Sequence, residues 1–307
     1  MGLKILKTSS YLPRNVVTNN DFEKYLDTSD EWISSRTGIK ERRFAVDEDT
    51  SDLVYKSVDK LNIEDKSKID LILVATFTSD KAMPTISSSI QKRLGLMEDI
   101  FAIDFNMACT GFVAGLKLCE KYLDTGRQAI LIGADLISKT LDKNDRGTVV
   151  LFGDGAGATL IEKNNKQQYF EIGTRSNDEC LKLNGRNIKN ESSFISMNGK
   201  EVFRFATEVL PVTIEKLLKE KNITIDDIDY VVCHQANYRI LNYVAKKTKI
   251  QVEKFYMNLD KYGNTSAASI PIVLDEMNSK GLLKQGQRII TIGFGAGLSW
   301  VGTILEW

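Results

Sequence analysis

The stretch Ala102-Ile103-Asp104-Phe105-Asn106-Met107-Ala108-Cys109-Thr110-Gly111-Phe112 runs from apolar residues into small ones and then into a helical pattern. It predicts a strand followed by a helix, with Cys109 at the junction. The first N–H groups of a helix lack internal partners and carry partial positive charge, which favours a thiolate and predicts a lowered thiol pKa. The alternative is a buried cysteine that acts as a small apolar side chain, the commoner role of the residue.

The composition is that of a globular protein without a strong overall charge. The chain has 307 residues, 42% of them hydrophobic and 27% charged, with a formal net charge of zero. This length favours about two domains, and zero net charge gives no general attraction to nucleic acid or membranes. No apolar run is long enough for a membrane span, and residues 1–7 lack the features of a signal peptide, so we expect a cytoplasmic protein whose N-terminus forms a strand.

The four cysteines contain no Cys-x-x-Cys pair, so neither a disulfide framework nor a zinc site is expected.

Two similar series of apolar and helical segments follow each other along the chain. The first series has expected strands at 69–75, 100–105 and 129–134 and helices at 87–94 and 111–123; the second has strands at 228–232, 254–258 and 288–293 and helices at 237–247 and 267–278. Ile228 follows Ile69 by 159 residues (228 − 69), and Gly293 follows Gly133 by 160 (293 − 133). This agreement predicts an internal duplication of an α/β unit with largely parallel sheets, divided into an N-terminal half, 1–165, and a C-terminal half, 166–307.

The duplication predicts a shared site. Ligands of such sheets bind beyond the carboxyl ends of the strands, so loops after equivalent strands of the two halves should converge. Those loops carry Cys109, His234 and Asn264. His234 is the only histidine, and either a structural or a catalytic role fits its position at a strand end. Asn264 suits a turn and helix cap, or the stabilisation of negative charge on a thioester oxygen.

Two glycine-rich stretches, 153–158 and 293–298, superficially resemble nucleotide-binding loops. Each is followed by a run typical of a strand, at 159–161 and 299–305, whereas the dinucleotide motif requires the start of a helix. We therefore expect tight turns and close backbone contacts at these glycines.

Seven motifs of this chain resemble those of the beta-ketoacyl-[acyl-carrier-protein] synthase III enzymes, members of the thiolase-like condensing superfamily. They cover nearly the whole chain and lie at residues 27–33 with 36–39, 108–112, 145–148, 151–158, 198–203, 234–237 and 262–269. The resemblance implies a duplicated five-layered α-β-α-β-α fold and a homodimer. It also implies that Cys109 takes an acyl group from acyl-coenzyme A and passes it to the carbanion of decarboxylated malonyl-acyl carrier protein, in the initiation of fatty acid synthesis.

The resemblance also assigns roles to single residues. His234 and Asn264 would bind the malonyl thioester carbonyl, and the N–H groups of Cys109 and Ala296 would form the oxyanion hole. The positions matching the coenzyme A channel are Trp32, Arg36, Arg146, Gly147, Phe203, Ala236 and Asn237, and those matching the carrier-protein docking surface are Arg204, Arg239, Lys246 and Lys247. Read from the residues alone, Trp32 could instead anchor a core, Arg146 could pair with Asp145, and the basic residues could form a solvated helix face.

Two positions depart from the family's usual pattern. Ala296 stands between Gly295 and Gly297 where relatives have three glycines, and its N–H can still serve the oxyanion hole if φ is negative. Met83 precedes Pro84 where the family often has Phe, in the loop that crosses the dimer to the partner's acyl pocket. Because Met is narrower and more pliable, the pocket can differ in size, and the preferred primer stays open.

Other functions compatible with the sequence are a synthase III-like acyltransferase or condensing enzyme of a secondary-metabolite pathway and a binding module without catalysis. The thiolase and hydroxymethylglutaryl-coenzyme A synthase branches fit less well, because residues 234–237 and 263–266 follow the decarboxylating pattern. We expect neither a metal nor another cofactor, and no nucleic-acid or membrane partner.

Overall fold

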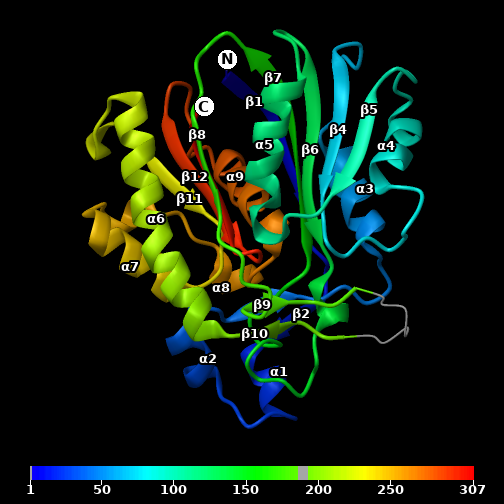
Figure 1. Cartoon of the computed structure of the whole chain (residues 1–307). Helices are drawn as coiled ribbons and strands as arrows, with labels where there is room; N and C mark the ends of the chain where they lie inside the picture. Colours follow the sequence, from blue (N-terminus) through cyan, green and yellow to red (C-terminus); the bar gives the residue numbers. More distant parts are fainter. Residues whose placement is uncertain (1, 186–192) are drawn as a thin grey trace.

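Two β-sheets lie face to face with helices between and outside them (Figure 1). This computed structural model describes residues 2–185 and 193–307. Helices α5 (Gly111–Tyr122) and α9 (Ser269–Ser279) lie between the sheets, α3 (Thr50–Lys60) and α4 (Ile86–Leu94) cover one outer face, and α6 (Gly199–Lys221) and α7 (Tyr238–Thr248) cover the other. The five-layered α-β-α-β-α arrangement predicted from the sequence is confirmed.

The first sheet comes from the N-terminal part of the chain. Its order is β1 (Gly2–Tyr11), β7 (Gly155–Asn164), β6 (Gln128–Asp135), β4 (Ile69–Ala75) and β5 (Phe101–Phe105). Strand β4 runs parallel to β5 and β6, whereas β7 runs antiparallel to β6 and β1. All eight residues of β6 are buried, as expected for a central strand covered on both faces.

The second sheet repeats this arrangement with one strand fewer. Its order is β11 (Tyr230–Cys233), β12 (Arg288–Gly295), β13 (Ser299–Glu306) and β8 (Phe170–Thr174), and only β11 and β12 are parallel. The expectation of largely parallel sheets is therefore wrong. Strand β13 returns directly after a short turn from β12, a connection that makes neighbours antiparallel.

The strand expected at 254–258 is also absent. A 3-10 turn, η4 (Val252–Lys254), and a single bridge between Val231 and Phe255 replace it. Beyond this bridge, the Asn258 N–H donates to the side chain of Gln235 at 3.1 Å, which draws the chain away from the sheet edge.

The ends of both sheets are closed by short elements at the foot of the molecule as drawn in Figure 1. These are β2 (Val16–Thr18), α1 (Asn19–Glu23), α2 (Asp30–Thr37), β3 (Glu41–Arg43), β9 (Leu181–Lys182), β10 (Ser196–Met197) and α8 (Leu259–Tyr262). Ser29 caps helix α2 by accepting the Trp32 N–H at 3.1 Å. Helix α6, with Pro211 in its interior, was not predicted.

Both glycine-rich stretches lead into strands, as expected. Strand β7 begins at Gly155, and β13 follows the second stretch. Neither stretch is followed by the helix N-terminus that the dinucleotide motif requires. Within residues 2–185 and 193–307, no helix is both long and apolar enough to cross a membrane.

Candidate active site

Cys109 lies in a tight turn that leads into α5. We call residues 106–111 the N-terminal elbow. The 3-10 turn η1 (Ala108–Thr110) stands between β5 and α5, and the Asn106 side chain holds its start by accepting the Ala108 N–H at 3.0 Å. Ala108 has φ +44°, a conformation that costs a non-glycine residue energy and that tends to persist at functional sites. The predicted strand-to-helix junction at Cys109 is confirmed.

The second half repeats this turn at residues 264–269, the C-terminal elbow. Its 3-10 turn η5 (Ser266–Ala268) leads into α9, Asn264 accepts the Ser266 N–H at 2.9 Å, and Ser266 has φ +50°. Ala267 occupies the position that corresponds to Cys109. The two elbows therefore share a backbone and differ in their side chains.

Each elbow packs against the central strand of the opposite half. A methyl group on Gly133 of β6 would lie 2.1 Å from the Ala267 carbonyl oxygen, and one on Gly293 of β12 would lie 2.9 Å from Thr110 Cα. At Gly295 it would lie 2.9 Å from Cys109 Cβ and 3.3 Å from Sγ. Glycine at these strand ends permits the close approach that brings both elbows to one site.

His234 follows β11 and lies beside the elbows. Its backbone N–H donates to the Ile292 carbonyl at 2.9 Å. Its imidazole ring packs edge-on against the Phe294 ring, with the ring centroids 5.3 Å apart. His234, Asn264 and Cys109 line one cavity of about 180 Å³, as the sequence predicts. Its other lining residues include Phe203, Ala236 and Asn237, three of the predicted coenzyme A positions.

Burial keeps both the thiol and the imidazole neutral. It raises the pKa of Cys109 to about 12, with a smaller lowering by the Ser266 hydroxyl and a further raising by the Asp135 carboxylate. Burial also lowers the pKa of His234 to about 3. The expectation of a lowered thiol pKa is thus wrong for the free protein, because desolvation outweighs the effect of the helix N-terminus. A neutral imidazole can both donate and accept a hydrogen bond.

The Asn264 amide is oriented with its NH2 group available. Two hydrogen bonds hold the backbone of Asn264. Its N–H donates to the Leu151 carbonyl at 2.9 Å, and its carbonyl accepts the Gly153 N–H at 3.0 Å. Since Oδ1 accepts from Ser266, Nδ2 is the free donor. In the part of the chain that the structure describes, His234 Nδ1 has no hydrogen-bond partner.

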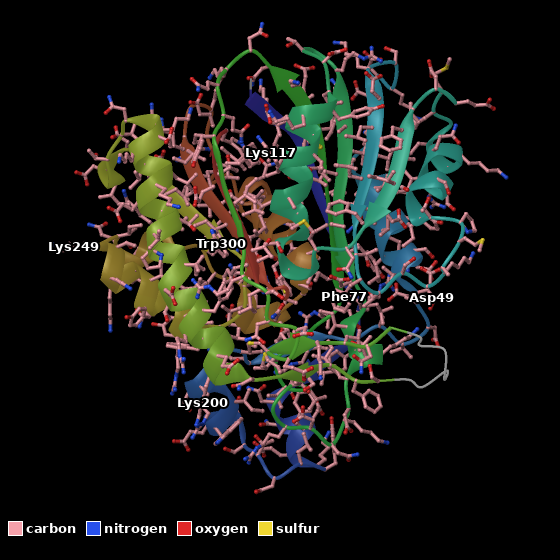
Figure 2. The ribbon with its side chains drawn as sticks, viewed as in Figure 1. Asp49, Phe77, Lys117, Lys200, Lys249 and Trp300 are labelled. Carbon is pink, nitrogen blue, oxygen red and sulfur yellow. The ribbon has the colours of Figure 1, made fainter. Side chains whose placement is uncertain are left out.

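A larger cavity of about 520 Å³ also reaches Cys109, from the side of Ser266 and Ala296. Ala296 is not among the residues with positive φ, which meets the condition set above for its N–H to serve an oxyanion hole. Phe77 lines this cavity, and Figure 2 shows it at the end of the first sheet that faces β9 and β10. Cys109 therefore lines both cavities.

Trp32, Arg36 and Arg146 gather at α2. The guanidinium carbons of Arg36 and Arg146 lie 4.7 and 4.6 Å from the centre of the Trp32 ring, distances typical of cation–π contact. Arg146 also lies 3.8 Å from the carboxylate of Asp27, so Asp145 is not its partner. Asn237 Nδ2 donates to the Arg36 carbonyl at 3.1 Å, which joins this cluster to the smaller cavity.

The remaining candidates lie outside both cavities. Gly147 follows Arg146 and donates its N–H to Asp145 at 2.8 Å, and Met83 is 84% exposed. The four basic candidates are all exposed on α6 and α7, namely Arg204, Arg239, Lys246 and Lys247. The structure thus brings the catalytic candidates together and leaves these residues on the surface.

Sequence reasoning missed three residues at the site: Ser266, Phe77 and Asp135. The signal for Asp135 was available, because it is an acidic residue at the end of a strand that is otherwise apolar or uncharged. Ser266 and Phe77 carried no comparable signal, since each stands in an ordinary polar loop. Within the described residues, no group of three or more His, Cys, Asp or Glu side chains could hold a metal ion.

The site thus consists of paired elbows between two covered sheets, with a cysteine on one and an amide on the other. Family models match two parts of the chain: residues 103–177 match 3-oxoacyl-[acyl-carrier-protein] synthase III, and residues 218–307 match its C-terminal region.

Complete proteins agree as well. Beta-ketoacyl-[acyl-carrier-protein] synthase III of Clostridium acetobutylicum is 43% identical, and that of Acholeplasma laidlawii 44%, each covering 100% of this chain and 99% of the relative. The crystal structure of the Thermus thermophilus synthase III is 38% identical, with a TM-score of 0.91 over 100% of this chain and 99% of that one. The chain belongs to the beta-ketoacyl-[acyl-carrier-protein] synthase III family.

Proposed function

We propose that this protein condenses a short acyl-coenzyme A primer with malonyl-acyl carrier protein to give 3-oxoacyl-acyl carrier protein and carbon dioxide, the step that initiates fatty acid synthesis. The observation that carries the proposal is the single cavity shared by Cys109, His234 and Asn264, which come from loops far apart in the sequence. Full-length relatives named for this activity support it.

In the first step the Cys109 sulfur attacks the primer's thioester carbonyl. The carbon–sulfur bond to coenzyme A breaks, and coenzyme A leaves with the proton that the thiol gives up. Negative charge on the carbonyl oxygen during this exchange is stabilised by the N–H groups of Cys109 and Ala296. Cysteine suits both capture and later release of the acyl group, because sulfur is a good nucleophile and a good leaving group.

In the second step the malonyl group loses carbon dioxide, and the electron pair of the broken carbon–carbon bond forms an enolate. His234 and Asn264 donate hydrogen bonds to the enolate oxygen, and the enolate carbon attacks the acyl group on Cys109. The carbon–sulfur bond then breaks, and the Cys109 thiolate takes up one proton. A neutral His234 fits this role, since it stabilises charge without protonating the carbanion.

Surface residues of two kinds would hold the substrates. Trp32, Arg36 and Arg146 offer an aromatic face and guanidinium groups to the adenine and phosphates of coenzyme A, with Gly147, Phe203, Ala236 and Asn237 along the same channel. Arg204, Arg239, Lys246 and Lys247 would receive the acidic carrier protein. Their exposure on the adjacent helices α6 and α7 supports this role.

We also propose a homodimer in which Met83 reaches the acyl pocket of the partner subunit. Apolar side chains exposed at or near the edge strand β5, among them Met83, Met97, Phe101 and Tyr122, support an interface there. The division into halves at 1–165 and 166–307 stays part of the proposal. Of the strands in the two large sheets, all those up to Asn164 belong to the first, and those after it, β8, β11, β12 and β13, belong to the second.

Incubation with acetyl-coenzyme A and malonyl-acyl carrier protein tests the function. We expect acetoacetyl-acyl carrier protein, carbon dioxide and a transient acetyl adduct on Cys109 in the intact-protein mass spectrum. An adduct without condensation would favour a binding module, and product formation only with other acyl donors or acceptors would favour a secondary-metabolite enzyme.

A further inference from the structure

Asp135 is a buried carboxylate to which the proposed mechanism gives no role. It ends β6, has no solvent exposure and is satisfied by hydrogen-bond donors from two other parts of the chain. A charged group is costly to bury, so donors must be held against it. The elements that carry these donors are therefore the ones that Asp135 holds in place.

The two carboxylate oxygens face different elements. Oδ1 accepts the Phe77 N–H at 2.9 Å and the hydroxyls of Thr76 and Thr78 at 3.1 and 3.2 Å. Oδ2 accepts the Ala267 N–H of the C-terminal elbow at 3.3 Å. One side chain thus joins the segment after β4 to the elbow that carries Asn264.

Both elements border Cys109. Phe77 lines the larger cavity beside the thiol, and Ser266, the neighbour of Ala267, lines the same cavity. The segment after β4 is also tied to the N-terminal elbow, because the Thr76 N–H donates to Phe105 at 3.0 Å directly before Asn106. A shift at either end of the Asp135 contacts would change the space around Cys109.

We propose that the larger cavity receives the primer chain and that Asp135 is a positioning residue, which couples residues 76–78, of which Phe77 lines that cavity, to the C-terminal elbow. Placement of Phe77 against the primer chain and placement of Asn264 against the malonyl group then depend on one carboxylate. This inference rests on the proposed condensation and extends it to the choice of primer.

Two substitutions separate the two sides of the carboxylate. In Asp135→Asn the amide oxygen still accepts from the three donors of residues 76–78, but its NH2 group meets the Ala267 N–H, so only the elbow contact is lost. Asp135→Ala removes both. Asp154 provides the matched control, because it is equally buried and accepts from Ser138 and Ala45 at 2.6–2.8 Å without lining either cavity.

We expect Asp135→Asn to lower condensation turnover about ten-fold or more, while the hexanoyl-to-acetyl ratio of kcat/KM for acyl-enzyme formation stays within about two-fold of wild type. Asp135→Ala should also change that ratio by about ten-fold. Asp154→Asn should lower the melting temperature and leave turnover and the ratio unchanged. Wild-type turnover in Asp135→Asn, or the same losses in Asp154→Asn, would overturn the proposal. If Asp135→Ala does not fold, the two asparagine variants decide it.

A second measurement needs no substrate. Ser266 borders the thiol, and its neighbour Ala267 is held by Asp135, so Asp135→Asn should change the rate of Cys109 alkylation by iodoacetamide at pH 8 several-fold, with Asp154→Asn unchanged. An unchanged rate in Asp135→Asn would contradict the proposal even if the wild type condenses. Conversely, a wild type that forms no product would overturn the proposed function and leave this measurement interpretable.

Discussion

The N-terminal and C-terminal elbows have the same backbone and different side chains. In both, an asparagine side chain accepts the N–H of the residue two positions later, that residue begins a 3-10 turn with positive φ, and a helix between the sheets follows. Cys109 on one elbow corresponds to Ala267 on the other. The two halves therefore use one backbone arrangement to present different side chains.

The asparagines show the same division. Asn106 is exposed at the mouth of the larger cavity, whereas Asn264 is buried with its NH2 group free at the smaller one. A hydrogen-bond donor stabilises developing charge far more strongly where water is excluded. Burial, and not the amide itself, thus makes one asparagine a candidate catalyst and the other a turn residue.

The largest effect is expected when Cys109 is replaced by alanine, the residue at the corresponding position, 267, of the C-terminal elbow. Cys109→Ala should lower condensation by roughly a thousand-fold or more and abolish the acyl adduct, because no other side chain takes its place. Slow decarboxylation of malonyl-acyl carrier protein should persist, since that step uses the other elbow. Mass spectrometry and release of carbon dioxide measure the two steps.

Cys119→Ala serves as the control for Cys109→Ala. Cys119 is buried in α5 and lines neither of the two cavities at Cys109, so this variant should keep the acyl adduct. An adduct that survives in Cys109→Ala would contradict the assignment of the nucleophile.

The second prediction compares the two asparagines. Asn264→Ala should lower condensation by about a hundred- to a thousand-fold while acyl-enzyme formation continues, because only the enolate loses its donor. Asn106→Ala should cost only a few-fold, through a looser N-terminal elbow. Separate rates of acyl transfer from acetyl-coenzyme A and of acetoacetyl-acyl carrier protein formation distinguish these outcomes.

Asn264→Asp refines this comparison. It keeps an oxygen for the Ser266 N–H but removes the Nδ2 donor and adds negative charge, so condensation should stay as low as in Asn264→Ala. Recovery of activity in Asn264→Asp would mean that Asn264 serves only its turn.

The third prediction concerns the glycines that receive each elbow. Gly293→Ala should destabilise the protein by about 1–3 kcal/mol, and Gly133→Ala by more, since its added methyl group would meet the Ala267 oxygen at 2.1 Å. Denaturant unfolding measures both. At Gly199 the nearest atom to an added methyl group is 3.8 Å away, so Gly199→Ala should be nearly neutral. Equal stability of the Gly133 and Gly199 variants would contradict the tight elbow contact.

The sequence predicted much of this arrangement because the duplication places matched strands and loops in both halves. Cys109, His234 and Asn264 could be brought to one site by that reasoning, and the family resemblance gave them roles. The prediction of a strand at 254–258 was wrong because the backbone leaves the sheet after one bridge, where the Asn258 N–H donates to the Gln235 side chain. No local sequence pattern reveals such a contact. Ser266, Phe77 and the function of Asp135 depend likewise on contacts between distant segments.

The smallest expected effect is the pH dependence of folding stability that comes from the His234 imidazole. The folded protein holds the pKa of His234 near 3, whereas an unfolded chain binds the proton near 6.5, so falling pH favours the unfolded state. The loss begins below about pH 6.5 and reaches about 2 kcal/mol at pH 5. Buried Asp135, whose pKa is raised to about 6, changes stability in the opposite direction below that pH and so masks part of the loss in the wild type.

The variant His234→Gln retains the Asp135 contribution and lacks the histidine contribution. The stability of the wild type relative to this variant should therefore fall by about 2 kcal/mol between pH 7 and pH 5, as measured by urea unfolding. A constant difference would mean that His234 binds its proton normally in the folded protein, and the neutral donor proposed for the enolate would then need another source.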